Sequence, residues 1–422
     1  MQAQWFRLDN AALIFPAIMR RNWSNAFRLS ATLTEPVDTA LLRQAAEALR
    51  PRFPTFFVRL RAGMFWYRLE RTDEPVQIEE DYAYPLTHMP RAYLRRRCLR
   101  ILCYGNRIAV EFFHAVTDGG GGMVFLQNLT AQYLRLKYGV SIAPEGRIVA
   151  LADRASAAET EDSFLRYCGP RPLRSAGSAA YRLHGSAEPD GFRHLTTGIA
   201  PTQTLCAAAK AQGVSVTAFL AAVMAEAVIS MQAEERPARR WKPVRITIPV
   251  DLRRLFGSET LRNFSLTLDA GVDPRLGSYT LLELCRQMDH QIRAQAVPQA
   301  MAGRIAENVN PQRNPLLRVT PLCLKTPVMR KVYAARGEKG GCINISNLGA
   351  VTLPDAMAPF VRRLEFIVGV QLTYPNNCAV VSCGGKTYIS MIRSIRESEI
   401  ERRFFSRLVA LGIPIDIESN QR

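Results

Sequence analysis

The sequence predicts a mixed α/β or α+β fold built as two roughly equal halves. Patterns typical of strands and helices alternate in the first part of the chain, break down over residues 140–192, and resume after it. Glycine, proline, serine and alanine accumulate over 168–191, as they do in connecting segments. We therefore expect an N-terminal lobe over 1–170, a crossover linker over 171–191 and a C-terminal lobe over 192–422.

In the N-terminal half, apolar residues at period two indicate strands and apolar residues at i, i+3 and i+4 indicate helices. Asp38 is a candidate N-cap for the first helix, and Gly105-Asn106 is a turn signal for the second hairpin. Gly139 is expected to close the helix before it. The predicted elements are a strand at 25–34, a helix at 38–50, a hairpin at 56–70 turning at Ala62-Gly63, a hairpin at 98–114 and a helix at 123–139.

The C-terminal half begins with a long apolar helix, for which Ser215 is the expected cap. Its run from Ala218 to Met231 carries Glu226, which favours a buried helix over a membrane span. The predicted elements are a helix at 214–232, strands at 243–253 and 262–272, a helix at 279–296, strands at 342–347, 363–373, 377–383 and 386–393, and a closing helix at 397–412.

The first apolar run, Ala11 to Met19, is too short to cross a bilayer. Pro16 interrupts it, Asp9 and Asn10 precede it, and no small-residue cleavage site follows. We therefore expect neither a signal peptide nor an N-terminal membrane anchor. The expected location is the cytoplasm.

Composition narrows the classes of ligand and partner. The 422 residues carry a formal net charge of +18, which favours an anionic partner. The basic residues are dispersed, with the densest cluster at 91–100, and no helix-turn-helix or aromatic RNA-binding motif accompanies them. We therefore expect no nucleic-acid binding. Nine cysteines without a CxxC pair or a Cys/His cluster predict free thiols and no metal site.

One of only five histidines, His114, ends an apolar strand face with Ile108, Val110 and Phe112. A structural core histidine is one interpretation. A buried imidazole, however, needs a partner for each ring nitrogen, and imidazole is the side chain best suited to take a proton near neutral pH. The four glycines at 119–122 suggest that another group approaches the backbone closely there.

The spacing His114-x-x-x-Asp118-Gly119 resembles the HxxxDG motif of the chloramphenicol-acetyltransferase-like superfamily. That superfamily includes peptide-synthetase condensation domains, plant BAHD acyltransferases and bacterial alcohol acetyltransferases, of which the last are the most similar. Residues 248–265, with an Asp-x-Arg and a downstream Asn-Phe, resemble a second segment of the family. The Ser-Asn-Leu-Gly within 344–354 resembles a third, and all three occur in the family's order.

The resemblance implies two acetyltransferase-like lobes that form a pseudo-dimer around a central tunnel. His114 would be the general base that deprotonates the acceptor. Asp118 would be a structural carboxylate paired with Arg253, with Arg254 as the other candidate partner. Gly119 would leave room for a pantetheine arm. Asp118 also suits a helix-capping turn, and the two roles are compatible.

The resemblance also implies the substrates. The donor would be acyl-CoA or an acyl-phosphopantetheine, with no tightly bound cofactor, and the acceptor a small-molecule or lipid-like alcohol, with an amine as the alternative. Ser346, Asn347 or a backbone N–H near Gly119 could donate to the oxyanion, although Ser346-Asn347 also suits a plain turn. The basic charge suits the phosphates of coenzyme A, an acidic acyl carrier protein or the surface of an anionic membrane.

Two departures from the family pattern separate its branches. Phe113 stands where many members have a second histidine, and strand parity points it away from the His114 face. No DFGWG segment occurs, which argues against a plant BAHD enzyme. The alternatives to a free-standing O-acyltransferase are a non-catalytic binding or accessory protein of the same fold and a stand-alone condensation-type domain acting on carrier-bound substrates.

Overall fold

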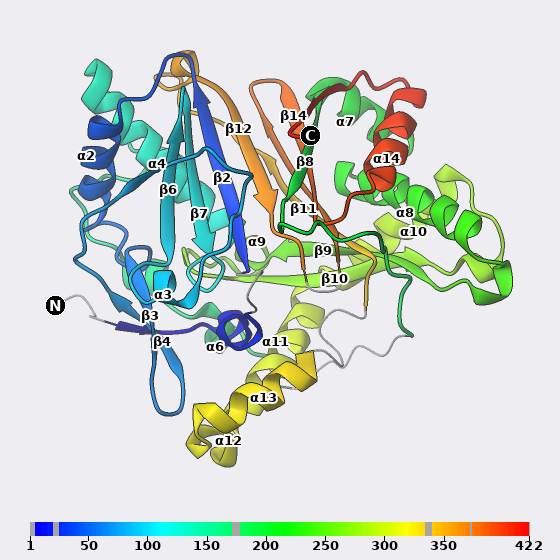
Figure 1. Ribbon diagram of the computed structural model, residues 1–422, viewed down its shortest axis with the longest axis horizontal. Helices are drawn as coiled ribbons and strands as arrows, with labels where there is room; N and C mark the ends of the chain where they lie inside the picture. Colours follow the sequence, from blue (N-terminus) through cyan, green and yellow to red (C-terminus); the bar gives the residue numbers. More distant parts are fainter. Residues whose placement is uncertain (1–4, 20–24, 171–177, 334–339, 372–373, 422) are drawn as a thin grey trace.

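The computed structural model describes residues 5–19, 25–170, 178–333, 340–371 and 374–421 (Figure 1). Two large sheets and one small sheet organise the protein. A five-stranded sheet has the strand order β12-β2-β7-β6-β5, and a seven-stranded sheet has the order β10-β9-β11-β13-β14-β8-β15. The three-stranded sheet has the order β1-β4-β3. This arrangement of mixed sheets and covering helices is the α/β fold that the sequence predicts.

The five-stranded sheet carries the strand that leads to His114. Helices α2 (Thr39–Leu49) and α4 (Gly119–Tyr138) pack against each other, and α4 covers β2 and β7. Asp38 caps α2, as expected, by accepting from the N–H groups of Ala40 and Leu41. The strands are β2 (Ala26–Leu33), β5 (Ile78–Glu80), β6 (Leu99–Tyr104), β7 (Arg107–Phe113) and β12 (Val361–Val368).

The seven-stranded sheet is the centre of the C-terminal half. Helices α8 (Val216–Glu235), α10 (Leu281–Gln295) and α14 (Glu399–Ala410) pack together beside it (Figure 1). Its strands are β8 (His194–Pro201), β9 (Val244–Asp251), β10 (Ser265–Val272), β11 (Ile343–Ala350), β13 (Asn376–Cys383), β14 (Lys386–Arg393) and β15 (Asp416–Ser419).

Helix α8 is the one helix of the described ranges that is long and apolar enough to cross a membrane. It contacts α10, α14 and β9, and 61% of its apolar window is buried within the protein. Ser215 accepts from the N–H of Ala218 as its cap, as the sequence predicts. The long apolar run is therefore accounted for by core packing.

The small sheet and several short helices complete the fold. The strands are β1 (Trp5–Arg7), β3 (Val58–Ala62) and β4 (Tyr67–Arg71). The helices are η1 (Ala11–Ile14), α1 (Phe15–Ile18), α3 (Arg91–Leu94), α5 (Ala157–Thr160), α6 (Ser163–Arg166), α7 (Thr202–Ala211), η2 (Ala238–Arg240), α9 (Leu252–Phe256), η3 (Pro274–Leu276), α11 (Pro298–Arg313), α12 (Pro315–Val319), α13 (Leu322–Val332) and η5 (Ala358–Phe360).

One strand joins the two halves. β12 belongs to the C-terminal half in sequence, yet it pairs antiparallel with β2 and completes the five-stranded sheet. The division into lobes at 1–170 and 192–422 stays a prediction. Strand β12 lies within 192–422 in sequence but belongs to the sheet of the N-terminal half. The linker expected at 171–191 lies partly outside the described residues, since 171–177 are not described.

The glycine run is helical, which corrects the expectation that the helix starts at residue 123. Helix α4 begins at Gly119, and Asp118 caps it. The glycines are required by close packing: a Cβ on Gly121 would lie 2.2 Å from the carbonyl oxygen of Leu261 and 2.3 Å from Thr117 Oγ1. The group that approaches this backbone is thus another segment of the same chain.

Candidate active site

His114 follows the last residue of β7. Its backbone N–H donates to the carbonyl of Asn25 at 3.0 Å. Its ring lies against those of Phe15 and Phe27, with centroids 5.0 Å away in each case. The side chain remains half-buried. Two aromatic rings therefore hold the imidazole in place while part of it stays accessible.

Asn263 determines which nitrogen of the His114 ring is free. Asn263 Oδ1 lies 3.0 Å from His114 Nδ1, and Asn263 Nδ2 donates to Asp9 Oδ2 at 3.0 Å. Both Asp9 oxygens accept from N–H groups, Oδ1 from Ala12 and Oδ2 from Asn263, so the amide nitrogen faces Asp9 and the amide oxygen faces the ring. His114 Nδ1 then carries the proton, which leaves the lone pair on Nε2.

Asp9 is fully buried beneath this amide. Burial raises the pKa of its carboxyl, against the opposing effects of the Arg262 guanidinium and the hydrogen bonds from Asn263 and the Ala12 N–H. Arg262 Nη2 lies 3.9 Å from Asp9 Oδ2 and also donates to the carbonyl of Arg7. Arg262 thus ties the loop of Asn263 to the segment that carries Asp9.

Asp118 is buried and bound on all sides by the protein. Arg253 contacts both carboxylate oxygens at 2.9–3.0 Å, and the N–H of Phe264 donates to Oδ2 at 2.8 Å. Burial disfavours the charged form, but the guanidinium and the hydrogen bonds from the N–H groups of Phe264 and Gly121 outweigh it and hold the pKa of Asp118 below its usual value. Asp118 is therefore a structural anion.

Arg253 extends this contact to the loop that carries Asn263. Its Nε donates to the carbonyl of Thr260 at 2.6 Å, and its Nη2 donates to the carbonyl of Arg262 at 2.5 Å. The expected strand ends at Asp251, so Arg253 lies in helix α9, whereas Arg254 is exposed. Asp118 acts on His114 indirectly, because the Arg253 pair holds the loop that positions Asn263.

The Ser-Asn-Leu-Gly segment lies in strand β11, and a local turn interrupts the strand there. The pairing with β13 shifts between Asn347 and Ala350, and the N–H of Gly349 donates to Asn347 Oδ1 at 2.8 Å. Its Leu348 meets the motif: a Cβ on Gly119 would lie 2.8 Å from Leu348 Cδ2. Asn347 Nδ2 donates to Thr217 Oγ1 at 3.0 Å, and Ser346 is buried. The structure thus brings this segment to Gly119, and the side-chain amide nitrogen of Asn347 donates to helix α8.

Sequence reasoning missed three residues of this site. Asn263 was noted only within a family-like segment, Asp9 only as the polar flank of an apolar run, and Phe15 not at all. All three reach His114 through contacts between segments that are distant in sequence. Local periodicity does not predict such contacts. The one available signal was a buried-type segment, 9–19, that begins with Asp and Asn.

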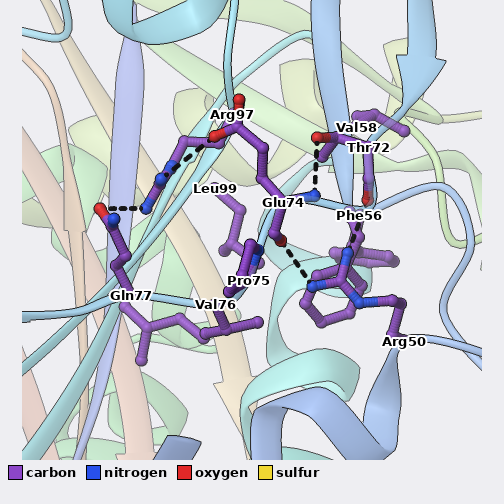
Figure 2. Close-up of a pocket in the computed structure, with 12 residues that line it drawn as sticks. Arg50, Phe56, Val58, Thr72, Glu74, Pro75, Val76, Gln77, Arg97 and Leu99 are labelled. Carbon is purple, nitrogen blue, oxygen red and sulfur yellow. Dashed lines mark hydrogen bonds and ion pairs between the residues drawn. The ribbon is translucent and has the colours of Figure 1, made fainter.

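Two hollows lie elsewhere on the protein. One lies at the C-terminal end of α2, against β3 and β6, where Figure 2 shows Arg50 and Arg97 with their guanidinium groups bound to Thr72, Glu74 and Gln77. The other lies between α8, η2 and α10. Neither hollow is lined by His114, Asp118 or Arg253. Within the described ranges, no three His, Cys, Asp or Glu residues gather as a metal site.

No family model and no curated protein matches the sequence. Solved structures do match the fold across almost the whole chain. TRI101 of F. graminearum complexed with coenzyme A and deoxynivalenol has a TM-score of 0.64 at 12% identity, covering 97% of each chain. The chain has the chloramphenicol-acetyltransferase-like fold.

Two further structures show the breadth of proteins with this chloramphenicol-acetyltransferase-like fold. The trichothecene 15-O-acetyltransferase TRI3 of Fusarium sporotrichioides has a TM-score of 0.61 at 11% identity, covering 96% of this chain and 94% of that one. The first condensation domain of the CDA synthetase has a TM-score of 0.59 at 15% identity, covering 97% and 96%. The two-lobed α/β expectation is confirmed, and these identities carry the fold alone.

Proposed function

We propose that the protein is an acyltransferase that moves an acetyl or longer acyl group from a coenzyme A thioester to a hydroxyl acceptor, with His114 as the general base. The supporting observation is the Asp9–Asn263–His114 series of hydrogen bonds. This series of hydrogen bonds leaves His114 Nε2 as a proton acceptor on a half-buried ring. The fold is shared with an O-acetyltransferase.

In this reaction, His114 Nε2 takes the proton of the acceptor hydroxyl as its oxygen attacks the thioester carbonyl. The tetrahedral intermediate then collapses, the carbon–sulfur bond breaks, and the imidazolium returns the proton to the leaving thiolate. The products are an ester and free coenzyme A. General base catalysis of this kind contributes about 10²–10⁴-fold, and alignment of the two substrates contributes more.

The other site residues take supporting roles in this proposal. Asp118 and Arg253 hold the loop that positions Asn263, without touching substrate. Gly119 sits where a side chain would collide with Leu348, so any pantetheine passing there depends on that leucine moving. Ser346 and Asn347 remain the proposed oxyanion donors, together with a backbone N–H near Gly119.

The net charge of the chain supports the proposed donor. Phosphates of coenzyme A, or an acidic acyl carrier protein, suit a chain of net charge +18. The donor and acceptor would approach through a tunnel between the lobes, and the acceptor would be a small-molecule or lipid-like alcohol. A cytoplasmic location, where acyl-CoA is available, is part of this proposal.

The test is His114→Ala, assayed with acetyl-CoA and a panel of alcohols by mass spectrometry of the products. The matched control is His290→Ala, because His290 is exposed on α10. We expect the first variant to lose transfer while both keep the wild-type melting temperature. Undiminished transfer by His114→Ala overturns the proposal, and absence of any acyl product with the wild type favours the non-catalytic binding protein.

A condensation-type reaction is the second candidate, because the CDA condensation domain matches 97% of the chain. Its donor would be an acyl group on a carrier-protein phosphopantetheine. Comparing kcat/KM for acyl-CoA with that for the same acyl group on a carrier protein separates the two. A strong preference for the carrier-bound acyl group supports the condensation-type reaction.

A further inference from the structure

Helices α12 and α13 form a projection at the lower edge of the protein, away from the two large sheets (Figure 1). The projection is built into the fold. Its inner side is fixed by the N–H of Leu322, which donates to the carbonyl of Met64, and by Arg330 Nε, which donates to the carbonyl of Ala17. Lys325 is buried, with Nζ 3.4 Å from the centroid of the Trp66 ring.

The opposite side of the projection is apolar and exposed. Leu324, Val328 and Val332 recur at intervals of four, so they share one stripe of α13, while Lys325 and Met329 lie on the inner side. The exposed apolar residues of the projection and of the adjoining β3–β4 hairpin tip, here called the outer apolar set, are Met64 (71% exposed), Leu316 (75%), Leu317 (38%), Val319 (65%), Leu324 (62%), Val328 (58%) and Val332 (54%). An exposed apolar set of this size marks an interaction site rather than scattered surface residues.

The charges around this set have one sign. Residues 308–333 contain five basic residues and no acidic residue. Four of them, Arg313, Arg318, Arg330 and Lys331, are exposed. Apolar side chains flanked by lysine and arginine suit the interface of an anionic bilayer, where the apolar groups enter the acyl boundary and the cations meet the headgroups.

We infer that the α12–α13 projection is a docking surface for anionic membranes. Charge decides the occupant. A second copy of the chain would bring the same basic residues face to face, which repels, whereas anionic phospholipid complements the exposed Arg313, Arg318 and Lys331. The inference does not depend on the chemistry of His114. The net charge of the chain favours contact with an anionic membrane without saying where, and the inference assigns that contact to one surface.

The docking surface lies close to the candidate active site. Helix α13 packs on α1, and Phe15 of α1 lies against the ring of His114. A protein docked by α13 would therefore hold the His114 ring near the membrane surface. That arrangement suits an acceptor dissolved in the lipid phase.

The test measures sedimentation of the whole protein with phosphatidylcholine vesicles, with and without phosphatidylglycerol. We expect binding only to the anionic vesicles, weakened by salt. Arg318→Gln and Lys331→Gln should each lower the partition coefficient about fivefold. Leu324→Gln combined with Val328→Thr should lower it about tenfold or more. Matched controls are Arg239→Gln, Arg240→Gln and the pair Leu276→Gln with Val409→Thr, which change exposed residues elsewhere.

Cys323 and Cys206 provide a second readout, because both thiols are exposed and Cys323 adjoins Leu324. An environment-sensitive dye on Cys323, with Cys206 replaced by serine, should brighten and shift to the blue with anionic vesicles. The same dye on Cys206, with Cys323 replaced by serine, should not. Equal binding to neutral vesicles, no binding, unchanged binding by the Leu324/Val328 variant, or a dimer that this variant dissociates overturns the inference.

Discussion

Asn263 Nδ2 donates to Asp9 Oδ2 at 3.0 Å, which joins two residues 254 positions apart in the sequence. The contact matters because an amide has one donating and one accepting end. With its donor end on a buried carboxylate, Asn263 presents its acceptor end to His114. A residue that lies between β1 and η1 thereby sets the tautomer of a ring at the end of β7.

The first prediction concerns Asp9→Asn. The substitution keeps the shape but removes the charge that fixes the orientation of Asn263, so the amide can turn and offer a donor to His114 Nδ1. We expect kcat to fall about tenfold or more, with KM for acyl-CoA nearly unchanged. Steady-state kinetics measures both. A purely structural role for Asp9 would instead lower stability and leave the kcat of the folded enzyme intact.

The second prediction concerns Asp118→Asn. An asparagine still caps α4, but it leaves the Arg253 guanidinium without its buried anion, so we expect a loss of about 3 kcal/mol in the free energy of unfolding at neutral pH. Chemical denaturation measures it. Asp251→Asn is the matched control, because it removes the other, more exposed partner of Arg253 and should cost under about 1 kcal/mol.

The pH dependence of the Asp118 contribution has a definite sign. Its pKa in the folded state is depressed below 3.8, so the carboxylate stabilises the fold above the unfolded value and loses that contribution as the pH falls through the folded one. The difference in stability between the wild type and Asp118→Asn should therefore shrink on acidification. A difference that is the same in acid and at neutral pH contradicts this assignment of charge.

The third prediction compares two glycines of one helical turn. Alanine at 121 would place its Cβ 2.2 Å from the Leu261 carbonyl oxygen, whereas alanine at 120 would meet Arg253 Nη1 at 3.1 Å, a contact that a shift of a few tenths of an ångström relieves. Gly121→Ala should destabilise the protein by about 2–3 kcal/mol and lower kcat, because it displaces the loop before Asn263. Gly120→Ala, with its helix-propensity gain, should be nearly neutral in the free energy of unfolding. Equal effects would mean that the loop can retreat from α4.

Local patterns in the sequence account for most of the individual elements and for little of their assembly. Period-two runs predicted β2, β6 and β7, and the cap residues Asp38 and Ser215 are placed as expected. The pairing of β12 with β2 was not predicted, because a strand's partner is set by packing that its own residues do not encode.

The site divides in the same way. The spacing of His114, Asp118 and Gly119 is local and was read directly. The contacts of Asp9 and Asn263 join distant segments, and the helical glycines looked like a loop because glycine is a poor helix former. The close approach of Leu348 to Gly119, of Leu261 to Gly121 and of Leu29 to Gly122 explains why the helix accepts glycine there. Helices α11, α12 and α13 were missed, and proline occurs within or at the start of α11 and α12 and within α13.

The fourth prediction concerns Asp162, whose pKa is raised to about 6 by burial and by the nearby negative charge of Asp9. The folded state thus holds a proton that the unfolded chain releases, so Asp162 favours folding below the unfolded value of 3.8 and loses this contribution as the pH rises through about 6. Asp162→Asn keeps a side-chain acceptor for the N–H of Phe164 and carries no charge at any pH. The variant should therefore unfold at a higher temperature than the wild type above pH 6, with the gap closing in acid, as thermal denaturation across pH would show. The kcat of Asp162→Asn should match that of the wild type, because removing the Asp162 charge only favours the ionised form of Asp9. A fall in kcat as large as that of Asp9→Asn would contradict this expectation. It would show that acidic residues near Asn263 act on His114 through more than the amide contact.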